Sequence, residues 1–206
     1  MNVELFPGLH LFQHHLDAAA QRSLWDECRA LADGPVPMYT PTVRGGRPMS
    51  VGMLCLGRHW NALTYDYEPR RSDFDDLPTP PILATFEAIA MSAASTAGYA
   101  FAPDICIVNF YSEASRLGVH QDKDERRETL DAGVPIVSVS LGDTARFVVG
   151  DVTRKEPTRP LMLHSGDVLV MGGPSRLRFH GVTRILPGTA PPGTGPGRFN
   201  LTFRQW

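Results

Sequence analysis

Cysteine is scarce in this sequence, and long apolar runs are missing from it. The three cysteines, Cys28, Cys55 and Cys106, are odd in number and form no Cys-x-x-Cys pair. This pattern excludes a disulfide framework and predicts reduced thiols in the core of a cytoplasmic protein. No segment approaches the roughly 20 apolar residues that span a bilayer, and residues 1–7 lack the basic and apolar regions of a signal peptide. We therefore expect no membrane partner.

An excess of positive charge is also absent. The chain has 20 Lys and Arg against 22 Asp and Glu, for a net charge of −2. Nucleic-acid binders usually carry a positive footprint, so any basic face must be local. On charge alone, a solvated surface explains the basic residues equally well. The residues that could form a basic face are Arg44, Arg47, Arg58, Arg70, Arg71, Arg126, Arg127, Arg154, Lys155 and Arg159.

Glycine and proline are plentiful, with 19 and 18 residues, which favours a turn-rich β architecture. Two apolar stripes at helical spacing predict helices at about residues 17–33 and 80–98. Many short strands with Gly and Pro turns indicate a sandwich or barrel. We therefore predict a mostly β fold with N-terminal helices (α+β), a double-stranded β-helix or jelly roll buttressed by two helices. The expected strands are 50–55, 63–67, 105–111, 135–141, 146–149, 168–171, 178–182 and 199–204.

A metal site is indicated by His120-Gln121-Asp122 followed about sixty residues later by a lone His180. In a strand, His120 and Asp122 share one face while Gln121 turns away. This spacing is typical of the two-His-one-carboxylate triad, which holds Fe(II) and leaves positions open for a co-substrate and O2. A single His-x-Asp is common and carries little meaning alone, and zinc accepts the same ligand types.

A basic strand follows the second histidine. Arg198, Asn200, Thr202 and Arg204 alternate with Phe, Leu and Phe, so the polar residues share a face. Two guanidinium groups inside a barrel are costly when unpaired, and a dicarboxylate would pair with both. A zinc site gives no reason for these arginines. The alternative is that both pair with acidic residues of the protein itself.

Neutral polar residues occur on two further strands. Asn109 and Tyr111 share a face of the 105–111 strand and would offer neutral hydrogen bonds to the same ligand. Ser138 lies among strong strand formers. Each is ordinary alone, because buried polar side chains often bond only to the backbone.

Seven segments together resemble the AlkB family, the alkylation-repair dioxygenases of bacteria. The resemblance covers about residues 103–205, half the chain, with the segments in the same order, and the joint occurrence of HQDKDE and RFNLTFRQ is very specific. The segments are Asn109-Phe110-Tyr111, His120 to Glu125, Pro135 to Gly142, Ser165 to Val168, Gly172 to Arg176, His180-Gly181-Val182 and Arg198 to Gln205.

The resemblance implies a ligand set. Fe(II) would be bound by His120, Asp122 and His180. O2 and 2-oxoglutarate would be the co-substrates. The 2-oxoglutarate would be bound by Asn109, Tyr111, Ser138, Arg198, Asn200, Thr202 and Arg204.

The resemblance also implies a substrate site within a single domain, 1–206, in which residues 35–80 form a nucleotide-recognition lid and residues 103–206 the catalytic core. Trp60 would stack on the damaged base, Tyr65 or Tyr67 would reach the nucleic-acid backbone, and Asp124 would face the methylated base. Arg154 falls where the family has a substrate-contacting arginine. Burial of Trp60 in the core is the alternative. The sequence departs from the family in residues 126–134, which form a longer segment than usual.

The implied function is oxidative demethylation of 1-methyladenine and 3-methylcytosine, with release of formaldehyde and succinate. The expected partner is methylated single-stranded and double-stranded DNA, with RNA left open, and the expected state is a monomer. Base damage on the Watson–Crick edge requires the base to leave the stack. Two alternatives remain: a hydroxylase of a small molecule or protein side chain, and a non-catalytic jelly-roll binding module.

Overall fold

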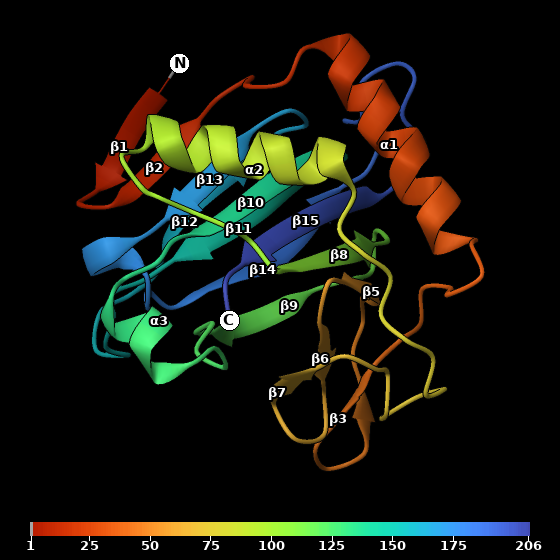
Figure 1. Ribbon diagram of the computed structural model, residues 1–206. Helices are drawn as coiled ribbons and strands as arrows, with labels where there is room; N and C mark the ends of the chain where they lie inside the picture. The colour runs from red at the N-terminus through yellow and green to blue at the C-terminus, as the bar shows by residue number, and fades with distance from the viewer. Residues whose placement is uncertain (1) are drawn as a thin grey trace.

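Two antiparallel sheets face each other in the computed structural model, which describes residues 2–206 (Figure 1). The seven-stranded sheet has the order β1-β2-β13-β10-β15-β8-β5 and the four-stranded sheet the order β12-β11-β14-β9. The strands of the larger sheet are β1 (Asn2–Phe6), β2 (Leu9–Phe12), β5 (Gly52–Leu56), β8 (Ile105–Tyr111), β10 (Ile136–Gly142), β13 (Val168–Met171) and β15 (Arg198–Arg204). Those of the smaller sheet are β9 (Leu117–His120), β11 (Thr144–Val149), β12 (Arg159–Leu163) and β14 (His180–Leu186).

Two helices cover the outer face of the larger sheet, as predicted (Figure 1). The first, α1 (Ala18–Ala32), begins where the Asp17 carboxylate accepts a hydrogen bond from the Ala20 amide at 2.8 Å. Its Leu24, Trp25 and Cys28 are buried in the core. Helix α2 (Ala84–Thr96) buries Phe86 and three alanines against the same sheet. The predicted jelly roll with a helical buttress is confirmed.

Strand alternation separates the two faces of the larger sheet. In β15, Phe199, Leu201 and Phe203 pack into the core beneath the helices. Arg198 and Arg204, on the opposite face of the same strand, point between the sheets, where they line a cavity. The apolar face of this strand thus belongs to the core, and its polar face belongs to the site.

The region between the helices forms two hairpins beside the sheets, β3 (Thr42–Val43) with β4 (Arg47–Pro48) and β6 (His59–Asn61) with β7 (Asp66–Glu68). We call residues 57–79, which contain β6 and β7, the lid hairpin. Its base is held by a buried cluster in which His59 Nε2 lies 2.6 Å from an Asp73 carboxylate oxygen and 3.3 Å from the Tyr39 hydroxyl. This cluster fixes the residue that follows His59, which is Trp60.

Several elements differ from the sequence prediction. Strands β1, β2 and β12 and the short helix α3 (Arg127–Asp131) were not expected. A 3-10 turn, η1 (Gly173–Ser175), precedes β14. Strand β5 falls within the predicted 35–80 lid segment, yet it pairs with β8 at the edge of the larger sheet. The three cysteines are free and buried, as predicted, and no helix among residues 2–206 is long and apolar enough to cross a membrane.

Candidate active site

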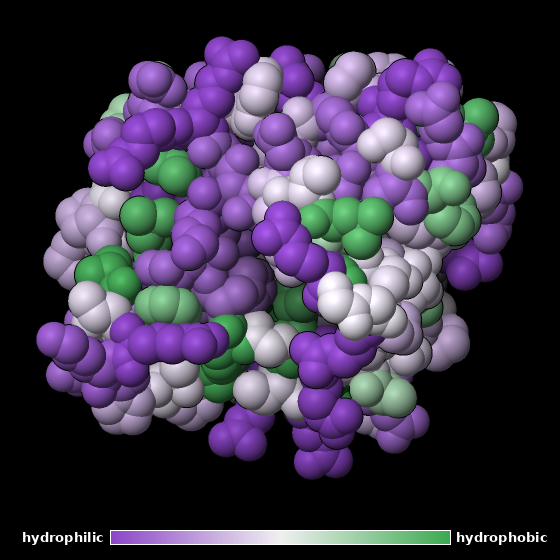
Figure 2. All heavy atoms as spheres, turned by 90° about the horizontal axis from the view of Figure 1, so that it is seen from below, coloured by the Kyte–Doolittle hydropathy of each residue, from purple (hydrophilic) through white to green (hydrophobic). Residues whose placement is uncertain are grey.

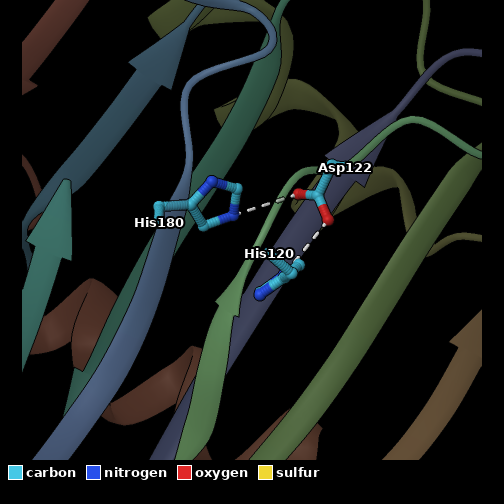
Figure 3. A group of neighbouring side chains, drawn as sticks. All are labelled: His120, Asp122 and His180. Carbon is cyan, nitrogen blue, oxygen red and sulfur yellow. Dashed lines mark ion pairs between the residues drawn. The ribbon is translucent and has the colours of Figure 1, made fainter. Parts of the chain in front are cut away.

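The three predicted metal ligands come together between the sheets (Figure 3). His120 ends β9 and is the register partner of His180, which begins β14. The Nε2 atoms of both histidines lie 3.4 Å from carboxylate oxygens of Asp122. One ligand atom from each residue falls within 4.8 Å of the others. Asp122 lies two residues past the end of β9, so the loop and not strand alternation brings its carboxylate to the histidines.

Backbone carbonyls orient both histidine rings. His120 Nδ1 lies 2.7 Å from the Gly118 carbonyl oxygen, and His180 Nδ1 lies 2.9 Å from the Arg178 carbonyl oxygen. A carbonyl can only accept, so Nδ1 carries the proton and Nε2 presents its lone pair to the centre of the group. Metal-bound histidines are usually held in this way.

This donor set fits a divalent first-row metal. With metal–ligand bonds of about 2.1 Å, two ligand atoms at right angles lie about 3 Å apart, close to the 3.4 Å between each Nε2 and the carboxylate. Two imidazoles and one carboxylate on one side of the ion are the ligands of the Fe(II) facial triad. His120, Asp122 and His180 would therefore hold the iron.

Arg204 pairs with carboxylates of the protein itself, which was the alternative to pairing with a dicarboxylate ligand. Its Nη2 lies 2.9 Å from Asp122 Oδ1, its Nε lies 3.5 Å from Glu125 Oε1, and its Nη1 donates to the Tyr67 hydroxyl. Burial would raise the pKa of the Asp122 carboxyl, but the Arg204 guanidinium outweighs it and holds that pKa well below its usual range. Asp122 is thus kept as a carboxylate that can bind a cation.

Arg198 lies at the other end of β15 and has no carboxylate within ion-pair distance among residues 2–206, although the more distant Asp167 favours its charged form. The residue is 1% exposed, and its guanidinium donates to Ser140 Oγ at 2.7 Å and to two backbone carbonyls. Its Nε has no hydrogen-bond partner. Burial lowers the pKa of Arg198 to about 10, so the group is still cationic at neutral pH. A buried cation without a direct ion pair is costly unless an anionic ligand joins it.

The neutral polar residues line the cavity between the two arginines. Asn200 Nδ2 donates to Ser138 Oγ at 2.8 Å, and Thr202 Oγ1 donates to Asn200 Oδ1 at 3.0 Å. Burial raises the pKa of Tyr111 to about 12, which keeps its hydroxyl a neutral donor. Asn109 lines the same cavity. All seven predicted 2-oxoglutarate residues therefore border one space, and Asn200, Ser138 and Thr202 already bond to one another.

An ion pair behind the metal ligands was missed by the sequence prediction. Arg176 Nη2 lies 2.9 Å from Glu125 Oε2, and both side chains are buried. Arg176 also donates to the backbone carbonyls of Asp122, at 2.7 Å, and Val134, at 2.9 Å. Glu125 and Arg176 thereby support the loop that carries Asp122. Both residues lie in segments that the family resemblance contains, but only the fold brings them together.

A groove leads from the surface to the metal ligands. Figure 2 views the lower end of Figure 1, where the lid hairpin, β9 and α3 lie, and shows the surface hollowed near its middle. Half-buried Trp60 packs against the small core under the lid and also faces the groove. Its indole Nε1 donates to Asp124 Oδ2 at 2.9 Å. The groove is lined by Val43, Met49, Met53, Trp60, Tyr65, Ile107, Asn109, Leu117 to Asp124, and Arg204.

The two lid tyrosines have different surroundings. Tyr65 is 39% exposed, its ring centroid lies 5.7 Å from that of Trp60, and the Arg44 guanidinium lies over its ring. Tyr67 is only 3% exposed and its hydroxyl contacts Arg204. Of the two tyrosines predicted as alternatives for a contact with the nucleic-acid backbone, Tyr67 is disfavoured, because its hydroxyl lies inside the protein. Tyr65 keeps the position that such a contact needs.

Arg154 is placed beside the groove. Its Nη2 donates to the backbone carbonyl of Val119 at 2.7 Å, and its guanidinium lies 5.1 Å from the ring centroid of Phe179. Val119 is part of the groove wall. The side chain is exposed and already has these two partners, so it borders the groove without entering it.

Comparison with known proteins supports the geometry. The model of the 2OG-Fe(II) oxygenase superfamily matches residues 8–204. The "alpha-ketoglutarate-dependent dioxygenase AlkB homolog" of Caulobacter vibrioides is 41% identical over 98% of this chain and 90% of that protein. This chain belongs to the AlkB family. The solved structure of OsALKBH1 is 39% identical, covers 100% of both chains and has a TM-score of 0.93.

A further AlkB relative is longer than this chain. "DNA N(6)-methyladenine demethylase ALKBH1D" of Arabidopsis thaliana is 38% identical over 97% of this chain but only 50% of that protein. The chain thus spans about half the length of some curated relatives it matches. Membership of the superfamily confirms the predicted enzyme class, an Fe(II)- and 2-oxoglutarate-dependent dioxygenase. It also confirms Fe(II) as the predicted metal and 2-oxoglutarate and O2 as the predicted co-substrates.

Proposed function

We propose that this AlkB-family protein oxidatively demethylates alkylated bases in nucleic acid. The observation that carries the proposal is the continuity of the groove from exposed aromatic side chains to the metal ligands. Trp60, Asp124 and His120 border the same space. A small-molecule or side-chain hydroxylase needs no such aromatic entrance, and a binding module needs no metal triad. The names of the AlkB relatives, which include a DNA demethylase, agree with it.

The groove residues suit a flipped, methylated base. The Trp60 ring offers a stacking surface, and stacking on an aromatic tolerates any base. Asp124 is an acceptor oriented by Trp60 Nε1. In 1-methyladenine and 3-methylcytosine, an exocyclic amino group lies beside the methylated ring nitrogen and would donate to such an acceptor. The methyl group would then point toward His120, Asp122 and His180.

The co-substrate would occupy the cavity behind the groove. We assign one carboxylate of 2-oxoglutarate to Arg198 and Tyr111. We assign its 2-oxo acid end to Asn109, Asn200 and the metal bound by the three ligands. Fe(II) held by His120, Asp122 and His180 would supply the oxidising chemistry, in which O2 and 2-oxoglutarate yield succinate and CO2. One oxygen atom would enter the methyl C–H bond, and the hydroxymethyl group would leave the ring nitrogen as formaldehyde. The base regains its pairing edge.

Formaldehyde release from a panel of oligonucleotides tests the proposal. We expect release, with equimolar succinate, from single strands that carry 1-methyladenine or 3-methylcytosine, and none from the unmethylated strand. N6-methyladenine in DNA, double-stranded versions and the matching RNA strands complete the panel and define the preferred substrate. If no member of the panel releases formaldehyde, and none raises succinate production above its level without nucleic acid, a hydroxylase of another substrate class is favoured.

Replacement of Trp60 by alanine tests the stacking surface. Base stacking on an aromatic side chain contributes roughly 1–3 kcal/mol, so Trp60→Ala should weaken binding of a 1-methyladenine oligonucleotide by about 5- to 150-fold. Decarboxylation of 2-oxoglutarate without nucleic acid should not change, since the arginines and the triad are untouched. Fluorescence anisotropy and succinate measurement give the two values.

Trp60→Phe is the matched control, because it keeps an aromatic ring but removes the hydrogen bond to Asp124. We expect it to retain most of the binding affinity and to lose discrimination between methylated and unmethylated strands. If Trp60→Ala binds as the unchanged protein does, the base lies elsewhere in the groove.

A further inference from the structure

One aromatic side chain holds two arginines next to the groove. The Arg126 guanidinium carbon lies 3.8 Å from a Trp206 ring centroid, and that of Arg58 lies 4.0 Å from one. The Trp206 backbone is fixed by its amide, which donates to Asp104 Oδ1 at 2.8 Å. We call Arg58, Arg126 and Trp206 the arginine stack.

The arginine stack is tied to the base-binding part of the groove by chain connectivity. Arg58 precedes Trp60 by two residues, and Arg126 follows Asp124 by two residues. Trp60 and Asp124 are joined by a hydrogen bond, so the two segments run beside each other. Two residues of extended chain span at most about 7 Å. The backbones of Arg58 and Arg126 therefore lie within about 7 Å of those of Trp60 and Asp124.

Among the described residues, Arg126 is a cation without an ion-pair partner, whereas the other charged side chains around it are mostly paired. Arg58 pairs with Asp104 at 3.4 Å, with 32% and 44% of their side chains exposed, and such an exposed pair contributes little. Asp124 is occupied by Trp60, and Glu125 is buried against Arg176. Arg126 is exposed, and none of the described carboxylates lies within ion-pair distance of it, whereas neighbouring Arg127 pairs with Asp131 at 2.8 Å. Lys123 adds a further exposed positive charge.

A stacked guanidinium is well suited to phosphate. Stacking on an indole holds the planar group in place while its N–H donors point outward from the ring edge. Phosphate oxygens accept such donors in pairs, with charge assistance. Because the side chain is already ordered on Trp206, little conformational entropy remains to be lost on binding.

We propose that the arginine stack, with Arg126 as the main ligand, binds a backbone phosphate of the nucleic-acid strand next to the flipped base. This rests on the proposed function, because it takes the strand to be the substrate. It explains how a chain with a net charge of −2 holds a polyanion, since one preordered cation beside the groove substitutes for a broad basic face. Arg58 supports the same phosphate from the lid hairpin.

The salt dependence of binding tests the assignment. For single strands, each phosphate contact contributes about 0.7 to the slope of log K against log salt concentration. Arg126→Gln should lower that slope by about 0.7 with methylated and unmethylated oligonucleotides alike. Arg127→Gln is the matched control and should leave the slope unchanged. Trp206→Ala should weaken binding, while Trp206→Phe retains it.

Four readouts separate the outcomes: basal decarboxylation, the salt slope, formaldehyde release and thermal stability. Decarboxylation of 2-oxoglutarate without nucleic acid should be the same in all four variants, because none of them touches the cavity. An unchanged slope in Arg126→Gln, with formaldehyde still released from the methylated strand, overturns the phosphate site and leaves the proposed function in place. If Arg126→Gln loses salt-dependent binding but no strand releases formaldehyde, the phosphate site is supported and demethylation is contradicted. Reduced thermal stability of Arg126→Gln with an unchanged slope makes the arginine stack a purely structural contact.

Discussion

Asp122→Ala is expected to abolish turnover while leaving the fold intact, and His120→Ala and His180→Ala should do the same. Removal of groups that only support metal ligands already costs about 10- to 100-fold in affinity or activity, so removal of a ligand should exceed this range. The fold should persist because the core lies on the opposite strand faces, under the helices. In Asp122→Ala, Arg204 keeps Glu125 and Tyr67 as partners.

Equilibrium Fe(II) binding, circular dichroism and formaldehyde release decide this prediction together. His15→Ala is the matched control, since His15 is exposed and its nearest ring partner is Phe12, outside the site. Tight iron binding with normal turnover in Asp122→Ala would remove Asp122 from the ligand set. Loss of the circular dichroism signal would instead show that the Asp122–Arg204 pair is needed for folding.

Strands with strong alternation were predictable from the sequence, and elements defined by tertiary contacts were not. The bounds of β8 and β13 agree with the expected 105–111 and 168–171. Helix α2 starts at Ala84, later than the expected 80, and Leu83 before it is its N-cap with extended backbone. The carbonyl of Pro80 instead accepts a hydrogen bond from the Gly57 amide at 2.7 Å. Only the folded chain supplies that partner.

The site shows the same division between local pattern and long-range contact. A strand over the expected 63–67 would place Tyr65 and Tyr67 on one face, but Tyr65 has a positive φ of 60° in the turn before β7. The alternation therefore does not extend to Tyr65, and the two rings separate. The Glu125–Arg176 ion pair joins residues 51 positions apart, a separation at which no sequence period operates. The polar face of β15, by contrast, follows from its own alternation.

The two arginines of β15 were predicted as equal halves of one clamp, and the structure gives them different surroundings. Arg204 shares its charge with Asp122 and Glu125. Arg198 has hydroxyl and carbonyl partners only. An incoming carboxylate therefore gains more from Arg198, which has no direct ion pair, than from Arg204. Replacement of Arg204 should affect the iron site as well, through Asp122.

Arg198→Lys should accordingly raise the KM for 2-oxoglutarate by more than tenfold, which corresponds to a loss of roughly 1.4 kcal/mol or more. Lysine keeps the charge but loses the planar fork that matches a carboxylate. Ser140→Ala removes the 2.7 Å hydrogen bond to Arg198 and should raise the KM in the same direction by a smaller factor. The dependence of succinate production on 2-oxoglutarate concentration gives these values.

Arg184→Lys, on the exposed side of β14, is the matched control for the clamp and should leave the KM unchanged. Fe(II) affinity should be preserved in Arg198→Lys, since Arg198 contacts none of the metal ligands, and reduced in Arg204→Lys, since Arg204 contacts Asp122. An unchanged KM in a folded Arg198→Lys protein would make Arg198 a structural residue. The buried charge would then be stabilised by Ser140 and the carbonyl groups alone, and the carboxylate of the co-substrate would have to bind at Arg204.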